Sequence, residues 1–470
     1  MKTILSLALC FVALLFFAVA LEGNESIKQP NIVVIMADDL GWGDVGWNGS
    51  EIKTPYLDRL AASGMILNQF YVYPVCSPTR AAMLTGRYPM RYGLQVGVVR
   101  PYNDFGLPTD ERTLADALRE AGYFTAICGK WHLGERRPQY LPLRRGFDHH
   151  YGHYLGAIDY YTHRRDGGLD WHRNGQPLQE EGYITDLKAT EAVRLIQGHD
   201  ISKPFFLYVA FHAVHTPVQM PPDPRLAEPY LHMDQPRRTY AAKLASMDEN
   251  VGRILAAIKE RGIENNTIII FCSDNGGDQP GRRSSNGPLR GGKTDLYEGG
   301  VRVPACIAWA GTIKAGSVSN QLIHITDLYP TLIKLAGGSL EQEKPIDGLD
   351  VRDVFLNEKT FEREILLNAT VFTGALRMDD WKIVVNGQVS SNALLGTDRR
   401  INTQVPENNR IEVFNIKDDP YERNNLSQSH PEKRQKLWER YLWYAEQAVP
   451  HLAAPAPSGF RAPEIWGLFD

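Results

Sequence analysis

The sequence predicts an α/β fold with a large mixed, mostly parallel sheet sandwiched by helices, followed by a smaller C-terminal α+β subdomain. Three observations support this. Four runs of apolar, often β-branched residues lack polar alternation, as expected of central parallel strands that are buried on both faces. Helical patterns separate these runs. Short alternating segments replace them after about residue 337. The runs are 31–37, 123–128, 205–211 and 267–272, and the helical patterns are 55–63, 113–121, 186–197 and 240–261.

The C-terminal part has a different pattern from the first three hundred residues. A polar stretch at 338–344 precedes short alternating segments, and a charged helical pattern follows at 431–448. This order predicts a small antiparallel sheet with one helix packed on it. The expected strands are 364–367, 375–377, 381–385 and 411–415. We therefore expect one domain over 30–337 and a subdomain over 345–470.

The first 20 residues resemble a signal peptide. Lys2 precedes an apolar run over 4–20 that ends in the small residues Ala18-Val19-Ala20, which matches a secretory cleavage site. A membrane anchor is the alternative, but the run is short for a span and no stop-transfer charges follow it. We expect an exported protein without a stable membrane anchor, periplasmic or secreted in a bacterium and lysosomal or extracellular in an animal.

Charge and cysteine content limit the possible functions. The formal net charge of −4 among 470 residues argues against a polyanion-binding surface over the whole protein, so no nucleic-acid partner is expected. Only Cys76, Cys128, Cys272 and Cys306 follow the signal peptide, which is few for an exported chain. Because Cys128 and Cys272 fall in strand-like runs, we expect buried thiols and a fold held by its core.

Polar residues follow each of the four apolar runs. Asp38-Asp39 follows the first, Lys130 and His132 the second, His212 and His215 the third, and Asp274-Asn275 the fourth. In open α/β sheets, ligands bind at the carboxyl ends of the strands. Oxygen donors such as these suit Ca²⁺ or Mg²⁺. Either acidic pair alone would be read as a turn or cap, but two pairs aimed at one edge favour a metal site.

Cys76 is placed where a helix should begin. Pro78 suits the first helical turn, Ser77 is the expected cap, and Arg80 lies four residues on, on the same face as Cys76. The positive end of the helix dipole and the Arg80 guanidinium would then converge on one bound anion. The alternative for an isolated cysteine is a buried, inert thiol.

The sequence around Cys76 resembles the signature of the type I sulfatases, members of the alkaline phosphatase-like superfamily. Cys-x-Pro-x-Arg is followed by Ala-x-x-Leu-Thr-Gly-Arg, and further matches are Gly-Lys-Trp-His-Leu-Gly, His-Ala-Val-His-Thr-Pro and the segment 288–300. The resemblance extends from Asn31 to about Leu426. Residues 145–150, 156–163 and 323–327 look most like the arylsulfatase B-like branch.

This resemblance implies the chemistry of sulfate ester hydrolysis. A formylglycine-generating enzyme would oxidise Cys76 to formylglycine (3-oxoalanine), whose hydrate is the nucleophile. His215 with Lys293 would protonate the leaving alcohol, His132 would act as base, and Asp274 would help to activate the nucleophile. The cationic side chains and a divalent ion would outweigh the three aspartates, which suits an anionic ester. The implied catalytic residues are Cys76, Arg80, Lys130, His132, His215 and Lys293, and the implied ligands of Ca²⁺, or alternatively Mg²⁺, are Asp38, Asp39, Cys76, Asp274 and Asn275.

The arylsulfatase B-like features imply a galactose- or N-acetylgalactosamine-type 4-sulfate on a sulfated carbohydrate, with aryl sulfates as simpler substrates. The candidate substrate-binding residues are His149, His150, Tyr160, Tyr161 and Arg290, which could equally be loop or core residues. Two other functions remain open on this scaffold. One is a formylglycine-dependent phosphonate or phosphate ester hydrolase, and the other is a non-catalytic glycan-binding homologue.

Overall fold

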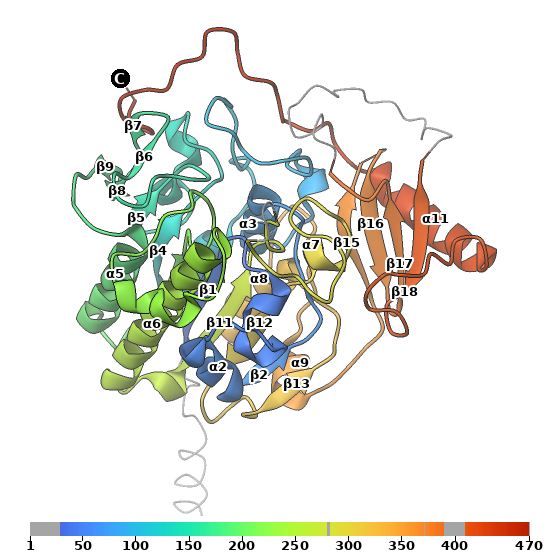
Figure 1. Ribbon diagram of the computed structural model, residues 1–470, viewed down its shortest axis with the longest axis horizontal. Coiled ribbons are helices and arrows are strands. Elements are labelled where there is room, and N and C mark those ends of the chain that lie inside the picture. Colours follow the sequence, from blue (N-terminus) through green and yellow to red (C-terminus); the bar gives the residue numbers. More distant parts are fainter. Residues whose placement is uncertain (1–28, 280–282, 371, 390–408, 470) are drawn as a thin grey trace, which may run out of the picture.

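The computed structural model describes residues 29–469, except 280–282, 371 and 390–408. The expected signal peptide, residues 1–20, lies outside the described residues. Figure 1 shows the arrangement: a large unit built on one twisted sheet, and a smaller sheet beside it that carries helix α11. Among the described helices, none has the length and apolar character needed to cross a lipid bilayer.

The large unit is built on a ten-stranded sheet with the order β13-β2-β12-β11-β1-β10-β4-β5-β8-β9. The four predicted strands form its centre as neighbouring parallel strands, which confirms the predicted core: β11 (Thr267–Ser273), β1 (Asn31–Ala37), β10 (Phe205–Ala210) and β4 (Phe124–Lys130). Every residue of β1 is buried. The remaining strands are β13 (Ser317–Ser319), β2 (Met65–Leu67), β12 (Ala305–Ala308), β5 (His149–His153), β8 (His172–Arg173) and β9 (Gln176–Pro177).

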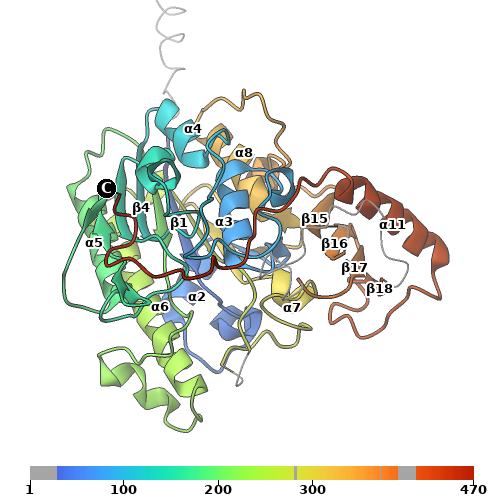
Figure 2. The ribbon, with the colours of Figure 1, turned by 90° about the horizontal axis from the view of Figure 1, so that it is seen from above.

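Helices cover both faces of this sheet. Alternate residues of β1 belong to separate hydrophobic clusters: Val34 packs with α3 and α8, whereas Val33 packs with α5 and α6. Each such aliphatic side chain contributes about 1.5–3 kcal/mol when it is fully buried. Figure 2 shows the same helices from above. The first face carries α3 (Cys76–Thr85), α4 (Leu114–Glu120) and α8 (Leu328–Leu335), and the second carries α2 (Pro55–Ala62), α5 (Ile184–Gly198) and α6 (Arg237–Glu260).

The smaller sheet is antiparallel, as predicted. Helix α11 (Pro431–Ala445) packs on it, with Leu437 and Tyr441 in the same hydrophobic cluster as Leu376 and Ile383. Its strands are β15 (Glu364–Ala369), β16 (Gly374–Met378), β17 (Trp381–Val385) and β18 (Ile411–Asn415). The other short elements are β3 (Phe70–Tyr71), β6 (Arg164–Arg165), β7 (Gly168–Leu169), β14 (Ile323–His324), α7 (Glu298–Val301) and α9 (Arg352–Asn357).

The chain beyond α11 does not stay with the small sheet. The amide of Leu452 donates a hydrogen bond of 2.8 Å to the Gly93 carbonyl, and the amide of Trp466 donates one of 2.9 Å to the Leu169 carbonyl. The Trp466 side chain is buried. Figure 1 shows this tail returning from α11 to β6 and β7. The tail therefore packs on the large unit, and the boundaries 30–337 and 345–470 stay a prediction.

Candidate active site

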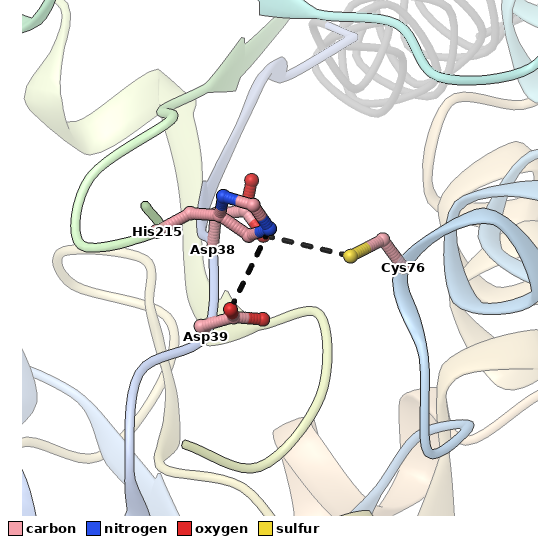
Figure 3. A group of neighbouring side chains, drawn as sticks. All are labelled: Asp38, Asp39, Cys76 and His215. Carbon is pink, nitrogen blue, oxygen red and sulfur yellow. Dashed lines mark hydrogen bonds and ion pairs between the residues drawn. The ribbon is translucent and has the colours of Figure 1, made fainter. Parts of the chain in front are cut away.

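The predicted site residues meet at the carboxyl ends of the central strands. Figure 3 shows the side chains of Asp38, Asp39, Cys76 and His215 pointing toward one another from three segments. Lys130 is the last residue of β4. This strand can approach β10 closely because Gly129 has no side chain. A Cβ at this position would lie only 1.9 Å from the Ala210 carbonyl oxygen.

Asp38 lies at the centre of the group. Its carboxylate accepts a hydrogen bond of 2.6 Å from Lys130 Nζ, and the Cys76 thiol lies 3.6 Å from its Oδ1. Arg80 Nη2 is 3.8 Å away and His212 Nδ1 is 3.6 Å away. Burial alone would raise the pKa of Asp38, but Lys130 and the other partners together hold that pKa well below its usual range. This carboxylate is therefore anionic at neutral pH.

Asp39 joins two further predicted residues to the group. Its Oδ1 lies 2.8 Å from Lys293 Nζ and accepts a hydrogen bond of 2.7 Å from Asn275 Nδ2. His215 Nε2 lies 3.6 Å from its Oδ2. Burial opposes the charge on Lys293, but Asp39 outweighs it and the pKa of Lys293 is raised well above its usual value. Lys293 is thus a protonated donor facing the site.

Arg80 and Asp274 form a buried ion pair behind Cys76. Arg80 donates to Asp274 Oδ2 through Nε at 3.2 Å and through Nη2 at 2.7 Å, and it also donates to the Tyr208 hydroxyl at 3.1 Å. Burial raises the pKa of Asp274 to about 6, with a further increase from Asp38 that Arg80 opposes. The guanidinium is held in one orientation by this network.

Helix α3 begins at Cys76 as predicted, but the predicted cap is wrong. Val75 is the N-cap, and it makes no side-chain capping bond. Ser77 lies inside the helix, where its hydroxyl donates to the His132 carbonyl at 2.8 Å. The first-turn amides, which have no partner within the helix, are therefore not capped by a side chain and lie beside Cys76. Burial raises the pKa of the Cys76 thiol.

The donor atoms fit a hard divalent cation. One ligand atom from each of Asp38, Asp39, Cys76 and His215 lies within 4.8 Å of the others. Asn275 Oδ1 is buried, and it has no hydrogen-bond partner within the described part of the chain. A buried amide oxygen of this kind is costly unless it binds a donor or a cation. Carboxylate and amide oxygens are the ligands that Ca²⁺ and Mg²⁺ prefer.

A cavity of about 290 Å³ opens over these residues. Cys76, His132, His215 and Lys293 are among the residues that line it. Burial, followed by the charge of Lys130, holds the pKa of His132 well below its usual value, and burial followed by Lys293 lowers the pKa of His215 to about 4. Both imidazoles are therefore neutral at pH 7. The other lining residues are Val75, Val98, Val99, Arg100, Pro101, Leu155, Gly156, Ala157, Arg165, Thr216 and Thr294.

The five candidate substrate-binding residues do not line this cavity. His149 is buried and lies 2.8 Å from Glu191, and His150 is fully buried against the Tyr154 ring. Tyr161 is partly exposed beside Met220, whereas Arg290 stacks on the Tyr297 ring. These four are held by contacts within the fold.

Tyr160, the fifth candidate, is fully buried. Its hydroxyl lies 3.0 Å from the His212 carbonyl oxygen and 2.9 Å from that of His215. Lys243 Nζ lies 4.2 Å from the centre of the Tyr160 ring and donates to the His215 carbonyl at 2.5 Å. Tyr160 and Lys243 thus hold the loop that carries His215. Lys243 belongs to no motif, and only its position in a helix beside a strand end could have drawn attention to it.

Comparison with known proteins agrees with this geometry. Residues 30–339 match the sulfatase family model. Arylsulfatase J from Mus musculus is 38% identical, in an alignment that covers 91% of this chain and 78% of the mouse protein. N-acetylgalactosamine-6-sulfatase from Mus musculus is also 38% identical, over 75% of this chain and 71% of that protein. The crystal structure of Ps i-CgsB, 32% identical, superposes with a TM-score of 0.81 over 92% of this chain and 96% of that chain. The crystal structure of Ps i-CgsB in complex with k-i-k-neocarrahexaose, 31% identical, superposes with a TM-score of 0.80 over 92% of this chain and 96% of that chain. The chain therefore belongs to the sulfatase family and is a sulfuric ester hydrolase.

Proposed function

We propose that this enzyme removes galactose- or N-acetylgalactosamine-type 4-sulfates from a sulfated carbohydrate, through a formylglycine that is made from Cys76. The observation that carries the proposal is the convergence of Cys76 with Arg80, Lys130 and Lys293 beneath the cavity, beside an Asn275 oxygen that no described residue pairs with. Three cations around one residue at a helix N-terminus suit a sulfate ester and the charge that develops as it breaks.

We propose Asp38, Asp39, Asp274, Asn275 and residue 76 as the ligands of Ca²⁺, with Mg²⁺ as the alternative. When bound, the ion would polarise the nucleophile and neutralise negative charge on the ester. His215 lies within the same group of ligand atoms. We keep it as a catalytic residue because its ring also lines the cavity, where it can reach a leaving group.

The chain's own residues divide the remaining work. Arg80, Lys130 and Lys293 hold the sulfate oxygens and orient sulfur for in-line displacement by a hydroxyl on residue 76. Lys293, the protonated donor that lies beside His215 in the cavity lining, protonates the departing sugar oxygen, because an alkoxide is a poor leaving group. His132, neutral and facing the cavity, then accepts the proton of the second hydroxyl, so that the C–O bond to the sulfate breaks, the aldehyde forms again and sulfate leaves.

The names of the relatives support a galactose- or N-acetylgalactosamine-type sugar. The position of the sulfate on that sugar, carbon 4, needs its own test. The relatives include an N-acetylgalactosamine-6-sulfatase and a structure that holds a carrageenan oligosaccharide. Initial rates on matched 4-sulfated and 6-sulfated N-acetylgalactosamine disaccharides test it. We expect faster release of the 4-sulfate, and preference for the 6-sulfate would overturn this assignment while leaving the sulfatase activity intact.

The modification at residue 76 is tested by peptide mass spectrometry. Protein co-expressed with a formylglycine-generating enzyme should yield a peptide around residue 76 in which an oxygen replaces the elements of H₂S. Rates on sulfate, phosphate and phosphonate esters should then favour sulfate. An unmodified cysteine in fully active protein would refute the proposed nucleophile, and faster phosphonate hydrolysis would refute the proposed substrate class.

We also propose that the chain is exported by its first 20 residues. Fractionation of cells that express the full chain, with N-terminal sequencing of the product, tests this. We expect an exported protein that begins after Ala20, and an intact N-terminus on intracellular protein would contradict it.

A further inference from the structure

The lining of the cavity includes two arginines that the proposed reaction does not use. Arg100 and Arg165 line it from segments that are far apart in the sequence. The cavity lining contains no aspartate or glutamate in the part of the chain that the structure describes. The lining is therefore cationic in a protein whose net charge is −4.

The Arg100 guanidinium has no ion-pair or hydrogen-bond partner among residues 29–469 apart from the undescribed gaps, and its Nε is buried. Its backbone is fixed, because the amide of Arg100 donates to Asn103 Oδ1 at 2.8 Å and Asn103 donates back to the Arg100 carbonyl at 2.9 Å. A partly desolvated guanidinium without a partner is unfavourable unless an anion pairs with it.

Arg165 is also held in place, on the short strand β6. Trp466 of the returning tail donates from Nε1 to the Arg165 carbonyl at 2.9 Å. The Arg165 side chain is 38% exposed, and its Nε lies 3.2 Å from Oδ2 of Asp166, whose side chain is 54% exposed. A pair this exposed to water is weak, so Arg165 remains available to another anion.

The cations around Cys76 each pair with a buried aspartate. Arg80 pairs with Asp274 at 2.7 Å, Lys130 with Asp38 at 2.6 Å and Lys293 with Asp39 at 2.8 Å. Among the described residues, Arg100 has no such partner, and Arg165 has only the exposed Asp166. A substrate whose only anionic group is the sulfate under attack, held beside residue 76, would leave Arg100 without a partner.

We propose that Arg100 and Arg165 form a second anion subsite, which binds a sulfate or carboxylate on the sugar next to the one that is desulfated. This inference rests on the proposed function and narrows it: the substrate is a polyanionic glycan rather than an isolated sulfated sugar. The planar guanidinium forks suit the oxygens of either anion.

The test compares substrates and variants in the matured, metal-loaded enzyme. The substrates are 4-nitrophenyl sulfate, a monosulfated neutral disaccharide, its disulfated counterpart, and a disaccharide in which a uronate carboxylate replaces the second sulfate. For Arg100→Ala and Arg165→Ala we expect kcat/KM on the dianionic disaccharides to fall about 10- to 100-fold more than on the monoanionic substrates, the range for a lost charge-assisted hydrogen bond. The dianionic disaccharide whose kcat/KM falls more shows whether the subsite prefers a sulfate or a carboxylate.

Arg164→Ala is the matched control. Arg164 is the neighbouring strand residue, so its side chain points to the opposite side from that of Arg165. It donates at 2.8 Å to the Gly167 carbonyl and does not line the cavity. The control removes the same charge and should leave the substrate ratio unchanged. An equal loss on all substrates in the Arg100 and Arg165 variants, or a similar loss of dianion preference in Arg164→Ala, would overturn the subsite.

A binding measurement separates this inference from the proposed function. Calorimetry with Cys76→Ala protein measures the affinity for the monosulfated and the disulfated disaccharide without any turnover. We expect tighter binding of the disulfated sugar, with the difference lost in Arg100→Ala on that background and partly restored by Arg100→Lys. Equal affinity for both sugars would overturn the subsite even if the enzyme is an active sulfatase, and absence of all sulfatase activity would overturn only the proposed function.

Discussion

Lys382 Nζ lies 2.9 Å from Glu298 Oε1 and joins the small sheet to the large unit. It also lies 2.9 Å from Glu422 Oε1, and all three side chains are buried. Burial raises the pKa of Glu422 to about 7, although Lys382 opposes the rise. One ammonium group therefore lies between two carboxylates, of which Glu298 also has Arg302 Nη1 at 3.7 Å.

Replacing Lys382 by Met should destabilise the fold by about 3–5 kcal/mol, because it removes the cation 2.9 Å from both buried carboxylates and leaves Glu298 with only the more distant Arg302. Urea unfolding at pH 7.5 measures the loss. Lys417→Met is the control, since Lys417 is 73% exposed and lies 3.9 Å from Asp380, so a change of at most about 0.5 kcal/mol is expected. Equal stability of the two variants would contradict a structural role for the buried network.

Asp248 should make stability depend on pH. Its carboxyl accepts the amides of Tyr56 at 3.1 Å and Leu57 at 2.8 Å, yet burial outweighs these bonds and raises its pKa to about 7. The folded state then holds a proton that the unfolded state releases near its ordinary pKa of about 4. The free energy of unfolding should therefore fall as pH rises from about 4 through 7, as far as this group is concerned.

The Asp248→Asn variant isolates that contribution. It cannot ionise, so its unfolding free energy should decline less steeply over the same pH range, although its stability at low pH is reduced by the loss of one acceptor oxygen. Urea titrations at intervals of half a pH unit give the two slopes. Parallel curves would show that Asp248 has an ordinary pKa.

Asn275→Ala should weaken metal binding. The change removes a buried oxygen that no described residue pairs with, and loss of a ligand should lower Ca²⁺ affinity by at least the 10- to 100-fold typical of outer-shell partners. Calorimetry on chelator-treated protein measures affinity without relying on activity. Asn68→Ala, at an amide that pairs with Asn320 on the surface, serves as control. Undiminished affinity in Asn275→Ala would exclude this oxygen as a ligand.

Cys76→Ser should stop turnover after one cycle. A serine hydroxyl can displace the alcohol and become sulfated, but it has no second hydroxyl whose deprotonation expels sulfate. Intact mass after incubation with substrate should show at most one added SO₃ per chain. Cys128→Ser, at a buried thiol away from the cavity, is the control for folding. Sustained sulfate release by Cys76→Ser would contradict the proposed mechanism.

Tyr160→Phe distinguishes a positioning role from substrate binding. The variant keeps the ring beneath Lys243 and loses only the hydroxyl that faces the carbonyl oxygens of His212 and His215. We expect kcat to fall about 10-fold, the effect of losing one hydrogen bond of about 1 kcal/mol or slightly more, with KM unchanged. A rise in KM at constant kcat would instead support direct contact with substrate.

The central strands of the large sheet could be predicted because the sequence pattern of each strand lies within the strand itself. A strand buried on both faces must be apolar at successive positions, and the runs 31–37 and 267–272 match β1 and β11 within one residue at each end. The polar residues after these strands were predictable for the same reason, since parallel strands must end at one edge.

Other features depend on packing, which local sequence does not encode. His150 and Tyr160 lie in polar, aromatic segments typical of binding loops, yet both are buried. The Ser77 hydroxyl found a partner in the His132 carbonyl, which is distant in sequence, instead of capping its own helix. Arg100 and Arg165 carry no motif, and only the folded chain brings them to one cavity.

Asp38 receives contacts from Lys130, Arg80, Cys76 and His212, which come from three separate segments. Energetic effects of changes at directly contacting positions do not add. Grafting this site onto another scaffold, or retuning it by directed evolution, will therefore require libraries that vary these positions jointly. Scanning them one by one would score as inactive the very substitutions that become productive in combination.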